Sequence, residues 1–510
     1  MAARSTEVET KLGVHGLFVV PDLSDPAAGV VEVQQRPPLA LRATYVDTPA
    51  LRLAREGITL RHRTGEGAPR WTLKLPNLNG SSNGLSRDEL SVDGPMSTLP
   101  DELRTLLVAV LRGQDVHPVA VLKTDRSTVV LLDAEGGLLA EVVDDTVSVL
   151  QGRRVVTRFR EIEVEQGEAA GAADACRAVT ERLLAAGAVA AEQLPKVVRA
   201  LGPRAQEPGD LPAPPVVDAR SPAGDLVLSA LRTALARVVA NDLGVRRAEH
   251  DAVHQMRVAC RRLRSDLRTF RALVEDERVG PLRDELKWLA GSLGEARDLE
   301  VLLERVDEVA SRDPLCALEE AGVADVRRLL QRNEDKALAA AHEALASPRY
   351  LALLQLLVDV ADEPRLTELA AQPCRDVLPP MVGGAWDHLA RRAGRLHTAD
   401  PDEEWHRARI LAKRARYAAE AVAVVLGKPA RRTAAAAERV QEVLGEHQDA
   451  AYAADHFLAL PRLEPGNGGL AVTCGRLAER ERAHIRTVRD GFPKAWRKAR
   501  RKGATGWMRG

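Results

Sequence analysis

The stretch Glu7-Val8-Glu9-Thr10-Lys11-Leu12 alternates charged side chains with apolar or small ones. Side chains two residues apart on a β-strand point to the same face, so Glu7, Glu9 and Lys11 would share one face of an extended segment. A strand of an antiparallel sheet usually buries an apolar face and leaves a polar face in water. The stretch therefore predicts a strand whose polar face carries two acids and a base in a row.

The same alternation recurs through the first part of the chain, interrupted by a few helical stretches such as residues 99–112 and 170–186. The alternating runs are Ile58 to Arg63, Arg70 to Leu75, Val119 to Leu132, Glu141 to Val149 and Arg158 to Glu165. Such a pattern is typical of an antiparallel β domain with a few helices.

Several of these strands carry like charges on one face, which repel each other. Arg61 and Arg63 share a face, as do Glu161, Glu163 and Glu165. A solvated face is the simplest interpretation of one such strand. Across many strands the pattern favours binding, because clustered carboxylates take a hard divalent cation and clustered Arg and Lys take phosphates. A closed barrel with a polar interior could hold both groups in one cavity.

The order of the charged motifs resembles the CYTH family, the triphosphate tunnel metalloenzymes. The series covers about 200 residues and runs through Glu7-x-Glu9-x-Lys11, Tyr45-Val-Asp47-Thr48-Pro49, Leu60-Arg61-His62-Arg63, Trp71-Thr-Leu-Lys74, Arg87-Asp88-Glu89 and Pro195-Lys196. The resemblance implies an eight-stranded antiparallel tunnel. Its basic residues would bind a linear triphosphate, and its acidic residues would coordinate Mg²⁺ or Mn²⁺.

Carried over to this sequence, the resemblance implies two sets of site residues. The metal ligands would be Glu7, Glu9, Glu163 and Glu165, with Glu161, Glu141 and Asp145 as further acidic candidates. The triphosphate contacts would be Lys11, Arg61, Arg63, Lys74, Arg87, Arg126 and Lys196. The catalytic base is not decided. His62 departs from the family pattern, where an apolar residue stands, and we expect it to point outward as a packing variation.

A Pro-rich stretch separates this domain from a helical one. It carries six prolines between Gly202 and Pro222 and is typical of a semi-rigid linker. We therefore predict a β domain at 1–201, a linker at 202–222 and a helical domain at 223–502.

The helical domain contains an internal repeat. The segment from His254 to Arg264 matches the segment from His406 to Arg416, and Leu293-Gly294-Glu295 matches Leu444-Gly445-Glu446 at nearly the same offset. Two matches at one offset predict two similar helical halves, at about 223–370 and 375–500.

Each copy of the repeat begins with a basic stripe at helical spacing. The stripes are His254, Arg257, Arg261, Arg264 and Arg268, and His406, Arg409, Lys413 and Arg416. A solvated helix face usually mixes both signs, because like charges at i,i+4 cost roughly 0.2–0.5 kcal/mol each. Two equivalent stripes of one sign instead favour an anion-binding surface.

The stripes and the Leu-Gly-Glu motifs resemble the CHAD family, a helical domain named for a conserved histidine. The resemblance covers about 223–500 and implies a pair of four-helix bundles that bind inorganic polyphosphate through the two stripes. A CYTH domain followed by a CHAD domain is itself a known family arrangement.

Composition excludes several other classes. The 510 residues include 73 basic and 73 acidic side chains, and the net charge of zero argues against a uniformly basic coat for nucleic acid. Aromatic residues, which base recognition uses, make up only 3%. Five scattered cysteines without a CxxC pair argue against a disulfide framework and a zinc site. We find no signal peptide and no run of about 20 apolar residues, so we expect a cytoplasmic protein without a membrane or nucleic-acid partner.

Together the resemblances imply metal-dependent hydrolysis of inorganic triphosphate, or a related triphosphate, in the tunnel. The helical domain would bind polyphosphate and bring the enzyme to polyphosphate granules. Two alternatives stay open. The chain could be mainly a polyphosphate-binding, granule-associated protein with weak enzyme activity, or the tunnel could act as a thiamine triphosphatase or an adenylate cyclase. A nucleotide substrate would need a base pocket, which the sequence does not expose.

Overall fold

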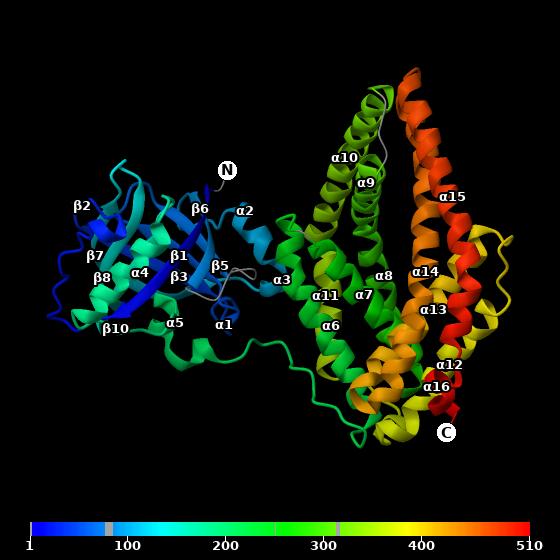
Figure 1. Ribbon diagram of the computed structural model, residues 1–510. Coiled ribbons are helices and arrows are strands. Elements are labelled where there is room, and N and C mark those ends of the chain that lie inside the picture. The colour runs from blue at the N-terminus through cyan, green and yellow to red at the C-terminus, as the bar shows by residue number, and fades with distance from the viewer. Residues whose placement is uncertain (1–2, 77–84, 250, 313–316, 510) are drawn as a thin grey trace. The chain divides into compact units, whose positions relative to one another are not determined.

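The chain forms two compact units, Met1–Asp210 and Leu211–Gly510, and each is described here by itself. The computed structural model describes residues 3–76, 85–249, 251–312 and 317–509 (Figure 1). The side chain of Glu7, a predicted metal ligand, and the whole of Cys316 lie outside the described residues. The boundary between the units falls inside the Pro-rich stretch of the sequence.

The first unit is built on an antiparallel sheet that closes on itself. Its strands are β1 (Ala3–Gly13), β2 (Glu32–Gln35), β3 (Leu39–Asp47), β4 (Thr59–Thr64), β5 (Arg70–Pro76), β6 (Leu85–Asp93), β7 (His117–Leu132), β8 (Leu138–Gln151), β9 (Arg154–Gln166) and β10 (Val189–Ala190). The strand order β1-β6-β5-β4-β3-β7-β8-β9 returns to β1, while β2 adds to β7 and β10 adds to β1. The antiparallel barrel predicted from the sequence is confirmed.

β1 closes the barrel by pairing with a different strand on each side. Its first part, Ala3 to Glu9, pairs with β6, and its second part, Glu9 to Gly13, pairs with β9. Glu9 takes part in both ladders, opposite Leu85 on one side and Glu165 on the other. The seam of the barrel therefore passes through the charged stretch that opens the sequence.

The apolar faces of the strands point out of the barrel. Leu12, Ile162 and Val164 pack against α4 (Ala172–Ala185), and Leu122 and Val147 pack in a second cluster with α5 (Lys196–Leu201). The other helices of this unit are short: α1 (Arg52–Arg55), α2 (Asp101–Arg104) and α3 (Val108–Leu111). The helix predicted at 99–112 is present as a continuous helical run from Asp101 to Leu111, in which a 3-10 turn at Thr105–Leu107 joins α2 to α3. Because the strands put their apolar sides outward, their charged sides line the interior.

The secondary-structure elements described in the second unit are all helices. Its helices are α6 (Ala223–Arg246), α7 (Ala252–Thr269), α8 (Val279–Ser292), α9 (Gly294–Arg312), α10 (Ala317–Ala346), α11 (Pro348–Asp362), α12 (Cys374–Ala393), α13 (Asp402–Leu426), α14 (Lys428–Ala459), α15 (Gly468–Ala499) and α16 (Lys502–Thr505). The helical character predicted for this part of the chain is confirmed.

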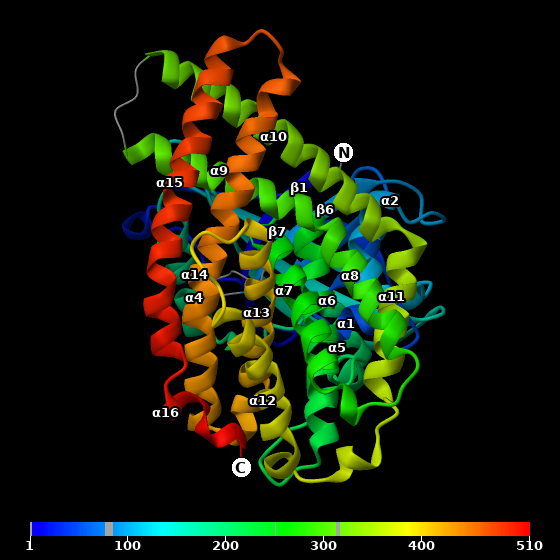
Figure 2. The same ribbon diagram turned by 90° about the vertical axis from the view of Figure 1, so that its right-hand side faces the viewer.

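The repeat in the sequence is also a repeat of helices. α6 and α12 begin 151 residues apart, at Ala223 and Cys374, and α10 and α15 begin 151 residues apart, at Ala317 and Gly468. The two halves are joined at the ends of their long helices, where α9 and α10 meet α14 and α15 (Figure 2). Leu302 and Val326 from the first half share one apolar core there with Phe457 from the second.

In the part of the chain that the structure describes, no helix taken singly has the length and apolar character to cross a membrane. One pair, Glu320–Ala346 and Pro348–Asp362, meets that test only when its two helices are taken together across a 59° bend.

Candidate functional site

The barrel encloses a charged cavity of about 340 Å³. All seven cations predicted to contact triphosphate line it: Lys11, Arg61, Arg63, Lys74, Arg87, Arg126 and Lys196. Four of the predicted metal ligands line it as well: Glu9, Glu141, Glu163 and Glu165. These residues come from seven strands and α5, and the alternation of each strand turns them to the same interior.

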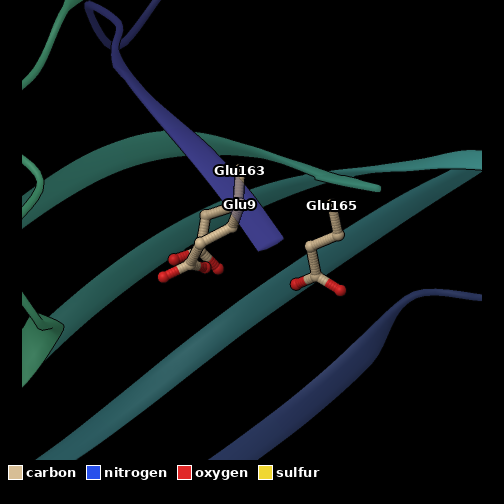
Figure 3. Close-up of side chains that lie close together, drawn as sticks. All are labelled: Glu9, Glu163 and Glu165. Atoms are coloured by element: carbon tan, nitrogen blue, oxygen red, sulfur yellow. The ribbon is translucent and has the colours of Figure 1, made fainter. Parts of the chain in front are cut away.

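Three of the carboxylates converge on one point of the cavity. Glu9 lies on β1 and Glu163 and Glu165 on β9, with one oxygen of each within 4.8 Å of the others (Figure 3). Three carboxylate oxygens at this separation are the donor set that a hard divalent cation prefers, and Mg²⁺ and Mn²⁺ are such cations. The site thus fits the metal that the sequence predicts, and the assignment of individual ligands stays a prediction.

Buried ion pairs form one wall of the cavity. The side chain of Glu163 contacts Lys11, lies 2.6 Å from Nζ of Lys196 and 3.7 Å from Nη2 of Arg126. Burial alone would raise the pKa of Glu163, but Lys196, Lys11 and Arg126 outweigh it and hold that pKa well below its ordinary value. The same attraction raises the pKa of Lys196 well above its ordinary value against the effect of burial. This wall therefore stays charged at neutral pH.

Two predicted metal ligands lie behind this wall. Asp145 is fully buried and accepts hydrogen bonds from Nε and Nη2 of Arg126, at 2.8 and 2.7 Å. It also lies 2.9 Å from Nζ of Lys196. Glu161 is also buried and lies 3.2 Å from Nζ of Lys196. Neither lines the cavity. In this geometry both carboxylates position the cations that face the cavity.

The opposite wall carries Arg61 and Lys74. Arg61 donates from Nη1 to the hydroxyl of Tyr45 at 3.3 Å, and its Nε is buried without a hydrogen-bond partner among the described residues. Nζ of Lys74 lies 3.0 Å from Glu89, and despite burial the charges of Lys74 and Arg61 lower the pKa of Glu89 to about 2. An anion in the cavity would give the buried Nε of Arg61 the partner it lacks.

Sequence reasoning left three ionisable residues of the cavity lining out of the site: Tyr45, Glu66 and Glu89. Tyr45 and Glu89 stand in motifs that the sequence resemblance quotes, and Glu89 lies two residues beyond Arg87 on the same strand face, so alternation could have found it. His62 is buried, stacks edge-on against Trp71 and contacts the carbonyl oxygen of Gly94 at 2.9 Å. It lies outside the cavity lining, in agreement with the expectation of a packing variation.

The helical unit holds a second large cavity, a groove of about 610 Å³ between its two halves. Six residues of the predicted stripes line it: His254, Arg257, Arg261, Arg409, Lys413 and Arg416. The structure thus brings the two copies of the repeat to face one another. Arg262 and Arg297, which the stripes did not include, also line the groove.

The remaining stripe residues lie elsewhere. His406 contacts Oε1 of Gln448 through Nδ1 at 2.6 Å. Arg264 lies near Arg283 of α8, and Arg268 is exposed. These three do not line the groove.

The groove concentrates positive charge that its acids only partly match. The Nε atoms of Arg257, Arg261 and Arg409 are buried without a hydrogen-bond partner among the described residues. Burial, together with the charges of Arg409 and Arg261, lowers the pKa of Lys413 to about 7. The three Nε donors lack partners, and the neighbouring cations disfavour the protonated form of Lys413. An anion would relieve both conditions, so the groove is suited to bind one.

With both sites described, comparison with known proteins identifies the family. A CYTH domain model matches residues 6–192 and a CHAD domain model matches residues 229–458. The chain therefore belongs to the proteins in which a CYTH domain precedes a CHAD domain. Members of the CYTH family are metal-dependent triphosphatases or cyclases. An uncharacterized protein of Mycobacterium tuberculosis (strain CDC 1551 / Oshkosh) is 33% identical over 529 residues, covering 98% of each chain, and a second strain carries an equally similar one.

Two solved structures resemble the chain over about half its length. PptA from Streptomyces chartreusis is 26% identical, with a TM-score of 0.45, over 54% of this chain and 100% of its own. The CHAD domain from the plant Ricinus communis is 27% identical, with a TM-score of 0.45, over 55% of this chain and 94% of its own.

Proposed function

We propose that the barrel hydrolyses inorganic triphosphate with Mg²⁺ or Mn²⁺. The observation that carries this proposal is the sorting of charge inside one small cavity. The acidic cluster Glu9, Glu163 and Glu165 stands beside a set of cations that includes Arg61 and Arg126. A short chain of phosphates needs such a combination, because its charge must be offset while one phosphorus is attacked.

The residues of the barrel would each do one part of this work. Arg61, Arg63 and Lys74 would bind phosphate oxygens and fix the chain along the cavity. Lys196 and Arg126 would do the same from the opposite wall, held in place by Asp145. A divalent cation bound to the acidic cluster would supply further charge neutralisation on the phosphates and Lewis-acid activation of water. The strong network of ion pairs would keep these groups in position before substrate arrives.

The proposal is tested by product analysis with four substrates. Purified full-length protein is incubated with triphosphate, thiamine triphosphate, ATP or long-chain polyphosphate, with Mg²⁺ or Mn²⁺, and phosphate, pyrophosphate and cyclic AMP are measured. We expect phosphate from triphosphate at the highest rate, and none after removal of the metal. Cyclic AMP as the main product would identify a cyclase, preference for thiamine triphosphate would identify that activity, and no metal-dependent turnover would leave the protein a binding protein.

We also propose that the groove of the helical unit binds inorganic polyphosphate and so brings the enzyme to polyphosphate granules in the cytoplasm. The supporting observation is that Arg257 and Arg261 from one half line the same groove as Arg409 and Lys413 from the other. In addition, Nε of each of the three arginines is buried without a hydrogen-bond partner among the described residues. A repeating polyanion would contact both halves at once.

A further inference from the structure

A smaller cavity of about 300 Å³ lies in the helical unit between α6, α7 and α13, and neither proposed activity uses it. Its walls are largely apolar, with Leu226 on α6, Leu263 and Phe270 on α7 and Val424 on α13. The volume is at the lower end of the range for small-molecule sites, which is about 300–1,000 Å³. The cavity therefore suits a ligand with a compact apolar part.

An unsatisfied carboxylate lies in this apolar surrounding. Asp266 lines the cavity, is only 6% exposed, and its Oδ1 is buried without a hydrogen-bond partner among the described residues. Leaving a buried polar group unpaired costs roughly 1–3 kcal/mol, and more if it is charged. Burial raises the pKa of Asp266 to about 8; Arg262 opposes this rise and Glu420 adds to it. Asp266 thus requires a donor that the described part of the protein does not supply.

The other charged groups of the cavity divide into a matched pair and one unmatched base. Arg262 lies 3.1 Å from Glu420, which also pairs at 2.6 Å with Arg416 from outside the cavity lining, so Glu420 already has two cationic partners. Arg237 is exposed at the rim of the cavity and forms no ion pair with any described residue. The carboxyl group of Asp266 and the guanidinium of Arg237 therefore remain available to bind a ligand beside an apolar wall.

We propose that this cavity binds a small zwitterion, an amino acid with an apolar side chain. Its ammonium group would donate to Asp266, its carboxylate would pair with Arg237, and its side chain would lie against Leu226, Phe270 and Val424. A simple amine would leave Arg237 unmatched, and a simple carboxylate would leave Asp266 unsatisfied. A zwitterion provides an ammonium donor for Asp266 and a carboxylate for Arg237 in one molecule.

The test compares three probes that share the isobutyl side chain of leucine, by ligand-observed saturation-transfer NMR on the full-length protein. The probes are L-leucine, which carries both charges, isopentylamine, which carries only the ammonium group, and 4-methylpentanoate, which carries only the carboxylate. We expect leucine to bind at least tenfold more tightly than either analogue. The affinity for leucine should rise at least tenfold from pH 6 to pH 8, because Asp266 loses its proton over this range. The charged groups that surround Asp266 are Arg262 of α7, Glu420 of α13 and Arg237 of α6.

Three variants check the assignment. Asp266→Asn and Arg237→Gln should each weaken leucine binding at least tenfold, while Arg332→Gln, an exposed arginine of α10 outside the cavity, should leave it unchanged. If Asp266→Asn does not fold, the exposed Arg237→Gln decides alone. No saturation transfer to leucine, equal binding of the three probes, or unchanged leucine affinity in Arg237→Gln would overturn the proposal.

Discussion

Arg257 and Arg409 stand 152 residues apart in the sequence and make the same ion pair. Nη2 of Arg257 lies 3.4 Å from Oδ1 of Asp298, and Nη2 of Arg409 lies 3.4 Å from Oδ1 of Asp449. Each aspartate stands three residues after the glutamate of its Leu-Gly-Glu motif. Each half of the helical unit therefore contributes to the groove one arginine that is oriented by an equivalent carboxylate.

This relationship predicts that charge reversal at both arginines abolishes polyphosphate retention. Loss of a hydrogen bond to a charged group costs about 1.5–3 kcal/mol. Two such losses therefore correspond to a weakening of at least about 100-fold. Retention of Arg257→Glu/Arg409→Glu on immobilised polyphosphate is compared with that of Arg332→Glu, which should bind normally. Triphosphate hydrolysis should persist in both variants, and unchanged retention in the double variant would contradict the assignment of the groove.

Lys413 makes the affinity of the groove depend on pH. Its pKa is lowered to about 7 by burial and by Arg409 and Arg261, while Asp449 opposes that effect and Arg257 adds to it. A polyanion favours the protonated lysine, so affinity should rise as pH falls through 7. Fluorescence anisotropy with labelled long-chain polyphosphate from pH 8.5 to 6 should show this step. Lys413→Met should remove the step, and a step of equal size in that variant would exclude Lys413 as its source.

The acidic cluster should be indispensable for turnover. Glu165→Gln keeps the size of the side chain but removes one anionic oxygen donor, and Glu9→Gln does the same on β1. We expect each change to lower kcat for triphosphate at least 100-fold, with partial recovery at high Mn²⁺ concentration. Asp144→Asn, whose side chain pairs with Arg160 on the outward face of β8, is the matched control. Full activity in Glu165→Gln would refute its role as a ligand.

Asp145 should contribute strongly to the stability of the barrel. Its replacement by Asn leaves Arg126 and Lys196 buried with one carboxylate fewer, and breaking such a pair typically costs about 3–5 kcal/mol. We expect a clear drop in the temperature at which β structure is lost, followed by circular dichroism, with little change for Asp144→Asn. Despite burial, Lys196 and Arg126 lower the pKa of Asp145, so its contribution should be present above pH 4 and fade as the solution is acidified further.

The sequence predicts the interior of the barrel well because a strand has a strict period of two. Once Glu9 and Lys11 are assigned to the inner face, the same rule assigns Arg61, Lys74 and Arg126 to it on their own strands. The rule does not separate an acid that faces the cavity from one that holds a neighbouring cation. Asp145 and Glu161 are set apart by Lys196, which enters from α5, a contact between segments far apart in the chain.

The helical stripes were predicted less fully, for a different reason. Spacing shows that Arg257, Arg261, Arg264 and Arg268 lie on one side of a helix. It does not show how much of that helix faces its partner. The groove ends before the end of α7, so Arg264 lies beside α8 and Arg268 is exposed. Only the packing of the two halves decides where the groove stops.

The two-sided pairing of β1 has a consequence for folding during synthesis. Within the barrel, β1 is the first strand to be synthesised, and because it pairs with both β6 and β9 its ladders cannot be completed until residue 165 has been made. Contacts between such distant segments slow folding, whereas helical units rich in local contacts fold fast. We therefore expect the barrel to depend on chaperones that shield β1 while it is unpaired. A translation pause after β9 would give β1 time to pair, whereas a pause before β9 would not.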